Sequence, residues 1–265
     1  MLTTNFFLKL ILTPLIIAAA TLVSRKWGER VGGLMIGLPL TSGPVSIFFA
    51  LEQGRSYAAS AAKGSILGLV PVAVFCASYV RSARRLPWYY AAMVSILLYL
   101  VAVLGMSLLG MELAPEVLLV SAMLGLGVVL IGKMDKVDHA LKSPWWDLPL
   151  RTIVATALVV GITTSAGALG PKWGGLLSPF PIFTFVMATF SHSQGGPAAA
   201  WRLIRGVLTG LFGYVAFFIV VNLLVEHASL VVVYLLATLA ALGMNGLSLL
   251  VLVRGNGHAA HAMIK

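Results

Sequence analysis

Charged residues are scarce in this sequence, and acidic residues are the scarcest of all. The 265 residues include 18 Lys plus Arg and only 8 Asp plus Glu, so 10% of the chain is charged, whereas soluble domains carry about 25%. Hydrophobic residues make up 60% of the chain, and the mean hydropathy is +1.00. So little polar surface could not cover so apolar a core, and a water-soluble globule is therefore not expected.

Motifs typical of catalysis and metal binding are also lacking. The single cysteine, Cys76, lies inside an apolar run, which excludes an intramolecular disulfide and a CxxC metal site. The sequence contains no GxSxG or HExxH motif, no GxxxxGK followed by Ser or Thr, and no pair of carboxylates within an apolar run. We therefore expect neither an enzyme nor a cofactor or metal site.

What the sequence does contain is a series of long apolar runs. A helix needs roughly 20 residues to cross a bilayer, and the runs are continuous rather than alternating with a period of two, which favours helices over a transmembrane barrel. The pattern predicts an all-α membrane protein with about nine transmembrane helices, at about 7–23, 31–51, 58–80, 88–110, 114–132, 149–168, 174–191, 200–225 and 230–253.

The basic residues predict an orientation for these spans. With nine spans, fourteen of the 18 Lys and Arg residues fall on one side of the membrane. By the positive-inside rule, we expect the N-terminus outside and the C-terminus in the cytoplasm, in the cell inner membrane. Because the basic residues stand in short segments between apolar runs, the net charge of +10 does not indicate nucleic-acid binding.

The sequence also repeats itself. The segment GERVGGLMIGLPLTSGPVSIFFALEQG, from Gly28, aligns without gaps with GPKWGGLLSPFPIFTFVMATFSHSQGG, from Gly170, at a constant offset of 142 residues. We predict a first four-helix repeat (1–110), a connector helix and cytoplasmic loop (111–148), a second four-helix repeat (149–254) and a polar tail (255–265). The odd connecting helix makes the second repeat enter the membrane from the opposite side, so the prediction is an inverted-topology 4+1+4 repeat.

The second copy of the repeat carries a family resemblance. GGLLSPFPIFTFVMATF, the Gly-rich turn HSQGG and the apolar span from Ala200 resemble the GlpM-type small membrane proteins, which include the four-span YdgC proteins. The resemblance covers about 149–253 and, more weakly, 7–108. It implies a tandem fusion of two such units in fixed opposite orientations. GlpM is linked to alginate production without an established molecular activity, so the resemblance bears on architecture more than on mechanism.

Proline and glycine interrupt helices 2 and 7 near their middles. Each proline removes an N–H and disturbs the carbonyl four residues earlier, such as that of Met35, and in hydrocarbon such oxygens need another partner. The interruptions can form a substrate site at the midplane of an inverted repeat, or they can be kinks packed against Gly-rich neighbours. The candidate substrate-binding residues are Pro39, Thr41, Ser42, Pro44, Pro179, Pro181 and Thr184.

Other polar residues receive structural interpretations. Glu29 and Asp147 are expected in cytoplasmic loops, Glu116 at a solvated helix end, and His192 in a simple polar turn. Two asparagines in spans eight and nine are expected to bond across helices as packing contacts; these are Asn222 and Asn245.

Two functions follow from this pattern. The first is a transporter-like membrane protein that moves a small, weakly polar or amphipathic substrate through a midplane site between the repeats. The alternative is a non-transporting scaffold or accessory subunit for envelope or polysaccharide assembly. The expected partners are membrane lipids and a small-molecule or lipid-like substrate, with a homodimer left open.

Overall fold

The computed structural model describes residues 2–108, 112–132, 144–168 and 180–261, and this part of the chain contains helices and no strands. The helices, in chain order, are α1 (Leu2–Trp27), α2 (Glu29–Ile36), α3 (Ser42–Glu52), α4 (Arg55–Leu67), α5 (Leu69–Ala83), α6 (Trp88–Met106), α7 (Leu113–Ile131), α8 (Asp147–Ala168), α10 (Ile182–Leu224) and α11 (Leu230–His261). The predicted all-α class is therefore confirmed for the described residues.

Five of the helical segments are long and apolar enough to cross a membrane, which makes this a helical membrane protein. They are Arg55–Ala83, Trp88–Met106, Leu113–Ile131, Ile182–Leu224 and Leu230–Ser248. The second expected span is divided into α2 and α3, of 8 and 11 residues. At about 1.5 Å per residue neither piece crosses the hydrocarbon alone, so a length criterion does not count this span.

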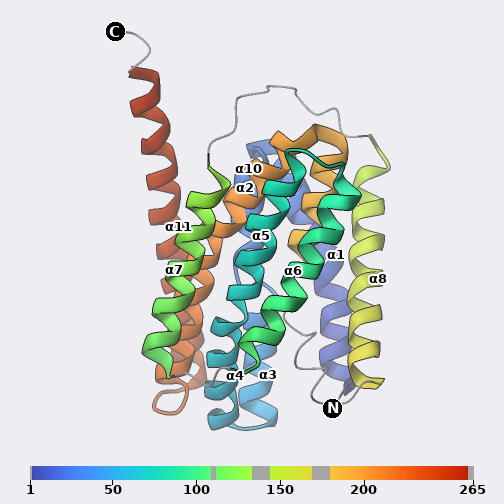
Figure 1. Ribbon diagram of the computed structural model, residues 1–265. Helices are drawn as coiled ribbons and strands as arrows, with labels where there is room; N and C mark the ends of the chain where they lie inside the picture. The colour runs from blue at the N-terminus through green and yellow to red at the C-terminus, as the bar shows by residue number, and fades with distance from the viewer. Residues whose placement is uncertain (1, 109–111, 133–143, 169–179, 262–265) are drawn as a thin grey trace.

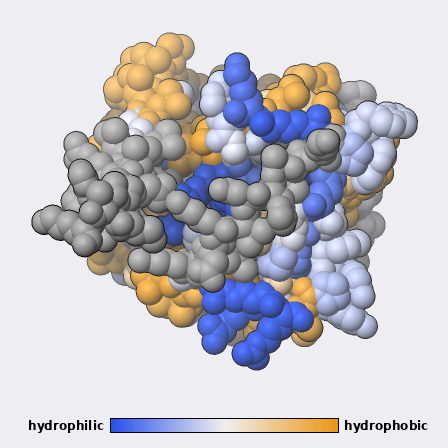
Figure 2. All heavy atoms as spheres, turned by 90° about the horizontal axis from the view of Figure 1, so that it is seen from above, coloured by the Kyte–Doolittle hydropathy of each residue, from blue (hydrophilic) through white to orange (hydrophobic). Residues whose placement is uncertain are grey.

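The helices form one bundle around α10 (Figure 1). α10 packs against α2, α4, α5, α7 and α11, and α1 packs along both α2 and α8. The start of α1 and the end of α11 lie at opposite ends of the bundle (Figure 1). Seen from the end where α11 finishes, hydrophilic residues run across the face between apolar patches at its edges (Figure 2).

The outer faces of the bundle are apolar. Large side chains on α6, α7 and α11 are exposed, among them Met93 at 64%, Leu118 at 71% and Val231 at 80%. The centre is filled by side chains such as Phe75 and Phe218, which are almost completely buried. An apolar exterior around an apolar core is what lipid, rather than water, accommodates.

α2 and the second half of α10 cross with their main chains in contact, through glycines. A β-carbon on Gly37 would lie 2.7 Å from the Gly210 main chain, and one on Gly210 would lie 2.5 Å from the Leu34 carbonyl oxygen. Two glycines four residues apart on each helix let the two main chains touch, as small residues do in membrane helix pairs. The four residues are Gly33, Gly37, Gly206 and Gly210.

The same helix geometry recurs at the offset of 142 residues. α6 begins at Trp88 and α11 at Leu230. Between 88 and 106 the buried positions of α6 are Ala91, Ala92, Ser95, Tyr99 and Val103. The buried positions of α11 over the corresponding residues are Val233, Tyr234, Ala237, Ala241 and Asn245, which are the same five shifted by 142.

Candidate functional site

The same turn occurs at Pro39, between α2 and α3, and at Pro181, directly before α10. At the first, the Leu40 N–H donates to the Leu38 carbonyl at 2.8 Å, so that Pro39 is the central residue of a three-residue turn. At the second, the Ile182 N–H donates to the Phe180 carbonyl, also at 2.8 Å, around Pro181. Pro181 has φ −81° and ψ 62°, which is the inverse γ-turn conformation.

A helix follows each proline: α3 begins at Ser42, three residues after Pro39, and α10 begins at Ile182, directly after Pro181. The Pro39 carbonyl accepts the N–H of Gly43, and the Pro181 carbonyl accepts the N–H of Phe185, both at 2.8 Å. Proline is tolerated just before a helix because its missing N–H would have no partner inside that helix. The Met35 carbonyl lacks the usual partner four residues later, which is Pro39, and instead accepts the N–H of Leu38, three residues later, at 3.1 Å.

The two breaks pack against the opposite halves of the chain in a reciprocal way. After the first break, α3 packs mainly on α4, and its start meets α10 at one point, where a β-carbon at Gly43 would be 3.2 Å from the Phe217 ring. The helix after the second break lies on α5, with the Phe185 and Phe75 ring centroids 6.5 Å apart. Residue 185 lies 142 positions after residue 43, and residue 75 lies 142 positions before residue 217. The two contacts therefore join equivalent positions of the two repeats.

The structure places the predicted site residues in two groups. Pro39, Thr41, Ser42 and Pro44 lie at the first break, where the Ser42 side chain reaches the Tyr214 hydroxyl on α10. Pro181 and the buried Thr184 lie at the second break, where the neighbouring Phe180 packs edge-on against Tyr99 of α6 at 5.4 Å. Among the described residues, no hydrogen bond or ring contact joins the two groups directly, and Pro179 lies outside these residues. A shared midplane site therefore stays a prediction.

A buried ionic cluster lies where α1, α8 and α10 meet. The Asp147 side chain is fully buried at the start of α8, and its two oxygens accept from Arg25 at 2.9 Å and from Arg151 at 2.7 Å. Gln194 of α10 donates to the same carboxylate. Burial alone would raise the pKa of the Asp147 carboxyl, but the hydrogen bond and charge of Arg151, followed by the bonds from Gln194 and Arg25, hold it below its ordinary value.

Arg151 extends this cluster into the apolar interior. It is 3% exposed, and its guanidinium lies 5.2 Å from the Phe190 ring centre and donates to the Met187 sulfur at 3.3 Å. Thr21 of α1 donates to the same sulfur at 3.4 Å. An aromatic face and a polarisable sulfur supplement the carboxylate as partners for this cation.

Glu29 forms a second acidic position beside the cluster. Its carboxylate accepts a hydrogen bond from Ser191 of α10 at 3.1 Å. Burial raises the pKa of Glu29, and the positive charges of Arg151 and Arg202, with the Ser191 bond, offset only part of that effect. The expectation of loop carboxylates is thus wrong for Asp147 and Glu29, since both stand in the first turn of a helix and bond to α10.

Two arginines lie over Trp201 at this end of the bundle, and a third, Arg202, lies near one of them, Arg30. The guanidinium groups of Arg30 and Arg205 each lie 5.2 Å from the centre of the Trp201 ring system. Burial, followed by the positive charges of Arg205 and Arg202, lowers the pKa of Arg30. This group presents more positive charge than Glu29 alone neutralises, so it favours anionic groups that approach this end.

Four further polar residues can be compared with their sequence-based interpretations. Glu116 is 2% exposed, so a solvated helix end is wrong. His192 is 7% exposed within α10, with its Nδ1 3.4 Å from the Tyr79 hydroxyl, rather than in a polar turn. Asn222 donates to the Ala59 carbonyl at 2.8 Å, which confirms an interhelical bond. Asn245 is buried, and the described residues give its side chain no hydrogen-bond partner.

Comparison with known proteins gives no identification: no protein-family model, curated protein or solved structure matches the chain. The resemblance to GlpM-type units therefore stays a prediction from the residues.

Proposed function

We propose that this chain is a nine-span inner-membrane transporter-like protein, built as an inverted 4+1+4 repeat, with its N-terminus outside and its C-terminus cytoplasmic. Its substrate is small and weakly polar or amphipathic, and it passes between the two repeats at the interrupted helices. The buried charged cluster of Asp147, Arg151 and Glu29 then lies on the cytoplasmic side, where it controls access to this path.

The observation that carries this proposal is the reciprocal packing of the two breaks. Each break turns around a proline, and the residue four positions after that proline meets an aromatic ring on the third helix of the other half, in the equivalent pairs Gly43–Phe217 and Phe185–Phe75. Two equivalent hinges in oppositely oriented halves can exchange conformations, which opens the path to one side and then to the other.

Two further observations support the repeat. The five buried positions of α6 recur on α11 at the same offset. Gly54 and Gly196, which the alignment pairs, both have positive φ, 95° and 69°, with extended ψ of 163° and −173°. Each of these glycines introduces the next helix, a conformation that favours glycine.

The proposal is tested by measuring from which side the two breaks can be reached. Thr41→Cys and Thr184→Cys, each made on a Cys76→Ala background, would be exposed to a membrane-impermeant thiol reagent in right-side-out and inside-out vesicles. A transporter should react at both positions from both sides. Replacement of both turn prolines, Pro39→Ala with Pro181→Ala, should slow the reaction from one side at least severalfold, because the hinges are lost.

A scaffold is the second candidate, and the close α2–α10 crossing favours it, since main chains in contact at Gly37 and Gly210 resist separation. For a scaffold, neither cysteine should react from either side in a folded protein. Reaction of each position from one side only would also reject transport. If neither cysteine reacts, or if each reacts from one side only, a scaffold is expected to keep a partner protein bound through purification.

A further inference from the structure

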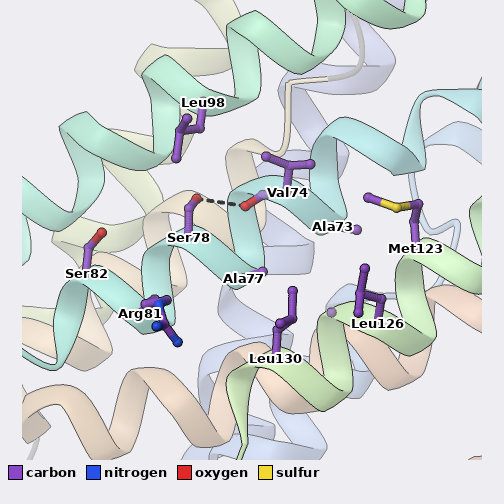
Figure 3. Close-up of a pocket in the computed structure, with 11 residues that line it drawn as sticks. Ala73, Val74, Ala77, Ser78, Arg81, Ser82, Leu98, Met123, Leu126 and Leu130 are labelled. Atoms are coloured by element: carbon purple, nitrogen blue, oxygen red, sulfur yellow. Dashed lines mark hydrogen bonds between the residues drawn. The ribbon is translucent and has the colours of Figure 1, made fainter.

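A groove separate from the interrupted helices runs along α5 between α6 and α7. It has a volume of about 520 Å³. Its floor is formed by small residues one turn apart on α5, Ala73 and Ala77, and its sides by Leu98 of α6 and Met123 and Leu130 of α7 (Figure 3). Over this length the groove is apolar.

The polar groups of the groove are unevenly distributed. Ser78 donates its hydroxyl to the Val74 carbonyl at 2.7 Å, so this polar group is directed to its own helix (Figure 3). Arg81 and Ser82 line the end of the groove near the end of α5. The groove therefore combines an apolar channel with an exposed guanidinium at one end.

The flanks of the groove indicate where its occupant comes from. The neighbouring faces of α6 and α7 expose large apolar side chains, such as Leu97 at 63% and Val129 at 73%. Such faces lie against lipid in a membrane protein, so the groove is open to the bilayer rather than to water. A molecule that enters from the bilayer and matches both parts of the groove has a long apolar chain and an anionic head.

We propose that this groove binds an anionic phospholipid, with one acyl chain along α5 between α6 and α7 and the phosphate at Arg81. The guanidinium geometry suits phosphate oxygens. Ala73 and Ala77 leave the width that an acyl chain needs.

The second half of the chain offers an internal contrast. The residues 142 positions after Ala73, Ala77 and Arg81 are Val215, Ile219 and Leu223 on α10. Larger side chains replace both alanines there, and the cation is lost. The small floor and the charged end thus occur together on α5 and disappear together on α10, as a lipid site confined to α5 requires.

Native mass spectrometry of the purified full-length protein tests this proposal, with phosphatidylglycerol or phosphatidylcholine added as the probe. Phosphatidylglycerol should bind more tightly. Arg81→Gln should weaken that binding about tenfold, to the level of phosphatidylcholine, since a charge-assisted bond is lost. Ala77→Ile, which copies the residue of the second half, should weaken binding of both lipids.

Arg85→Gln is the matched control, because Arg85 is exposed at the same end of the bundle but does not line the groove. Equal affinity of the parent for the two lipids would overturn the proposal. So would a loss in Arg85→Gln as large as that in Arg81→Gln, since the attraction would then be general. Arg81 is exposed, so its variant decides the question even if Ala77→Ile does not fold.

Discussion

Gly33 of α2 lies so close to Leu203 of α10 that a β-carbon at residue 33 would overlap the Leu203 carbonyl oxygen. Gly206, less than one turn further along α10, stands in the same relation to the carbonyl oxygen of Arg30. The two contacts are made by main-chain atoms, which cannot turn aside as a side chain can. Any side chain at either glycine must therefore push α2 and α10 apart.

We expect Gly206→Ala to destabilise the protein by about 1–3 kcal/mol, because the added methyl group overfills the crossing. Thermal unfolding in detergent, followed by circular dichroism, measures the change. Gly105→Ala on α6 is the control, since a β-carbon there meets nothing within 4 Å, and alanine raises helix propensity by up to about 1 kcal/mol. Equal effects of the two substitutions would contradict a close crossing at Gly206.

Asp147→Asn should cost about 3–5 kcal/mol, because it leaves the buried Arg151 and the adjacent Arg25 without their counter-charge. The same unfolding measurement applies. Glu52→Gln, at an exposed acid at the end of α3, should change stability by less than about 0.5 kcal/mol. If Asp147→Asn were as mild as Glu52→Gln, the carboxylate would not be holding α1, α8 and α10 together.

Glu29→Gln should make the protein more stable at neutral pH. Because burial raises the pKa of Glu29 in the folded state, its contribution to stability is fully present below its ordinary pKa of 4.5 and is lost as pH rises through the folded value. Glutamine carries no charge and still accepts the Ser191 bond, so this loss is removed. Melting temperatures of the parent and the variant should converge at low pH and diverge above it.

Asp147 has the opposite pH dependence. Its folded pKa lies below the ordinary value of 3.8, so its contribution to stability is present above that value and is lost as pH falls through the folded pKa. Glu29→Gln should leave this acid-side loss in place. A variant whose melting temperature follows the parent at every pH would contradict the assignment of the neutral-pH effect to Glu29.

The positions of the breaks could be predicted from local sequence features, but the burial of the charged residues could not. Proline lacks an N–H wherever it stands, so the break at Pro39 and a turn at Pro181 could be predicted from the residues alone. The burial of Asp147 could not, because it depends on α1 and α10 supplying Arg25 and Gln194 from positions far away in the chain. Its position at the first turn of α8 is equally compatible with a solvated helix end.

The groove at Arg81 could not be predicted from the sequence either, because it also depends on how distant helices pack. The basic residue is visible in the sequence, but a groove also requires α7 to lie beside α5, and α7 is the predicted connector, which has no counterpart in the repeat. Repeat symmetry therefore gives no indication of the groove. The small residues Ala73 and Ala77 become informative only when the wall formed by Met123 and Leu130 is known.

An inverted repeat makes a direct prediction about Leu51 and Ser193, which are separated by the same offset of 142 residues. Both are exposed, Leu51 at 64%, and the Ser193 hydroxyl bonds only within its own helix, to the Phe190 carbonyl. Leu51→Cys and Ser193→Cys, on the Cys76→Ala background, should therefore fold normally. An impermeant maleimide should label Leu51→Cys from outside and Ser193→Cys from the cytoplasmic side, as oppositely oriented halves require. Labelling of both from the same side would mean that the two halves are parallel, and the exchange of equivalent hinges across the membrane would then be impossible.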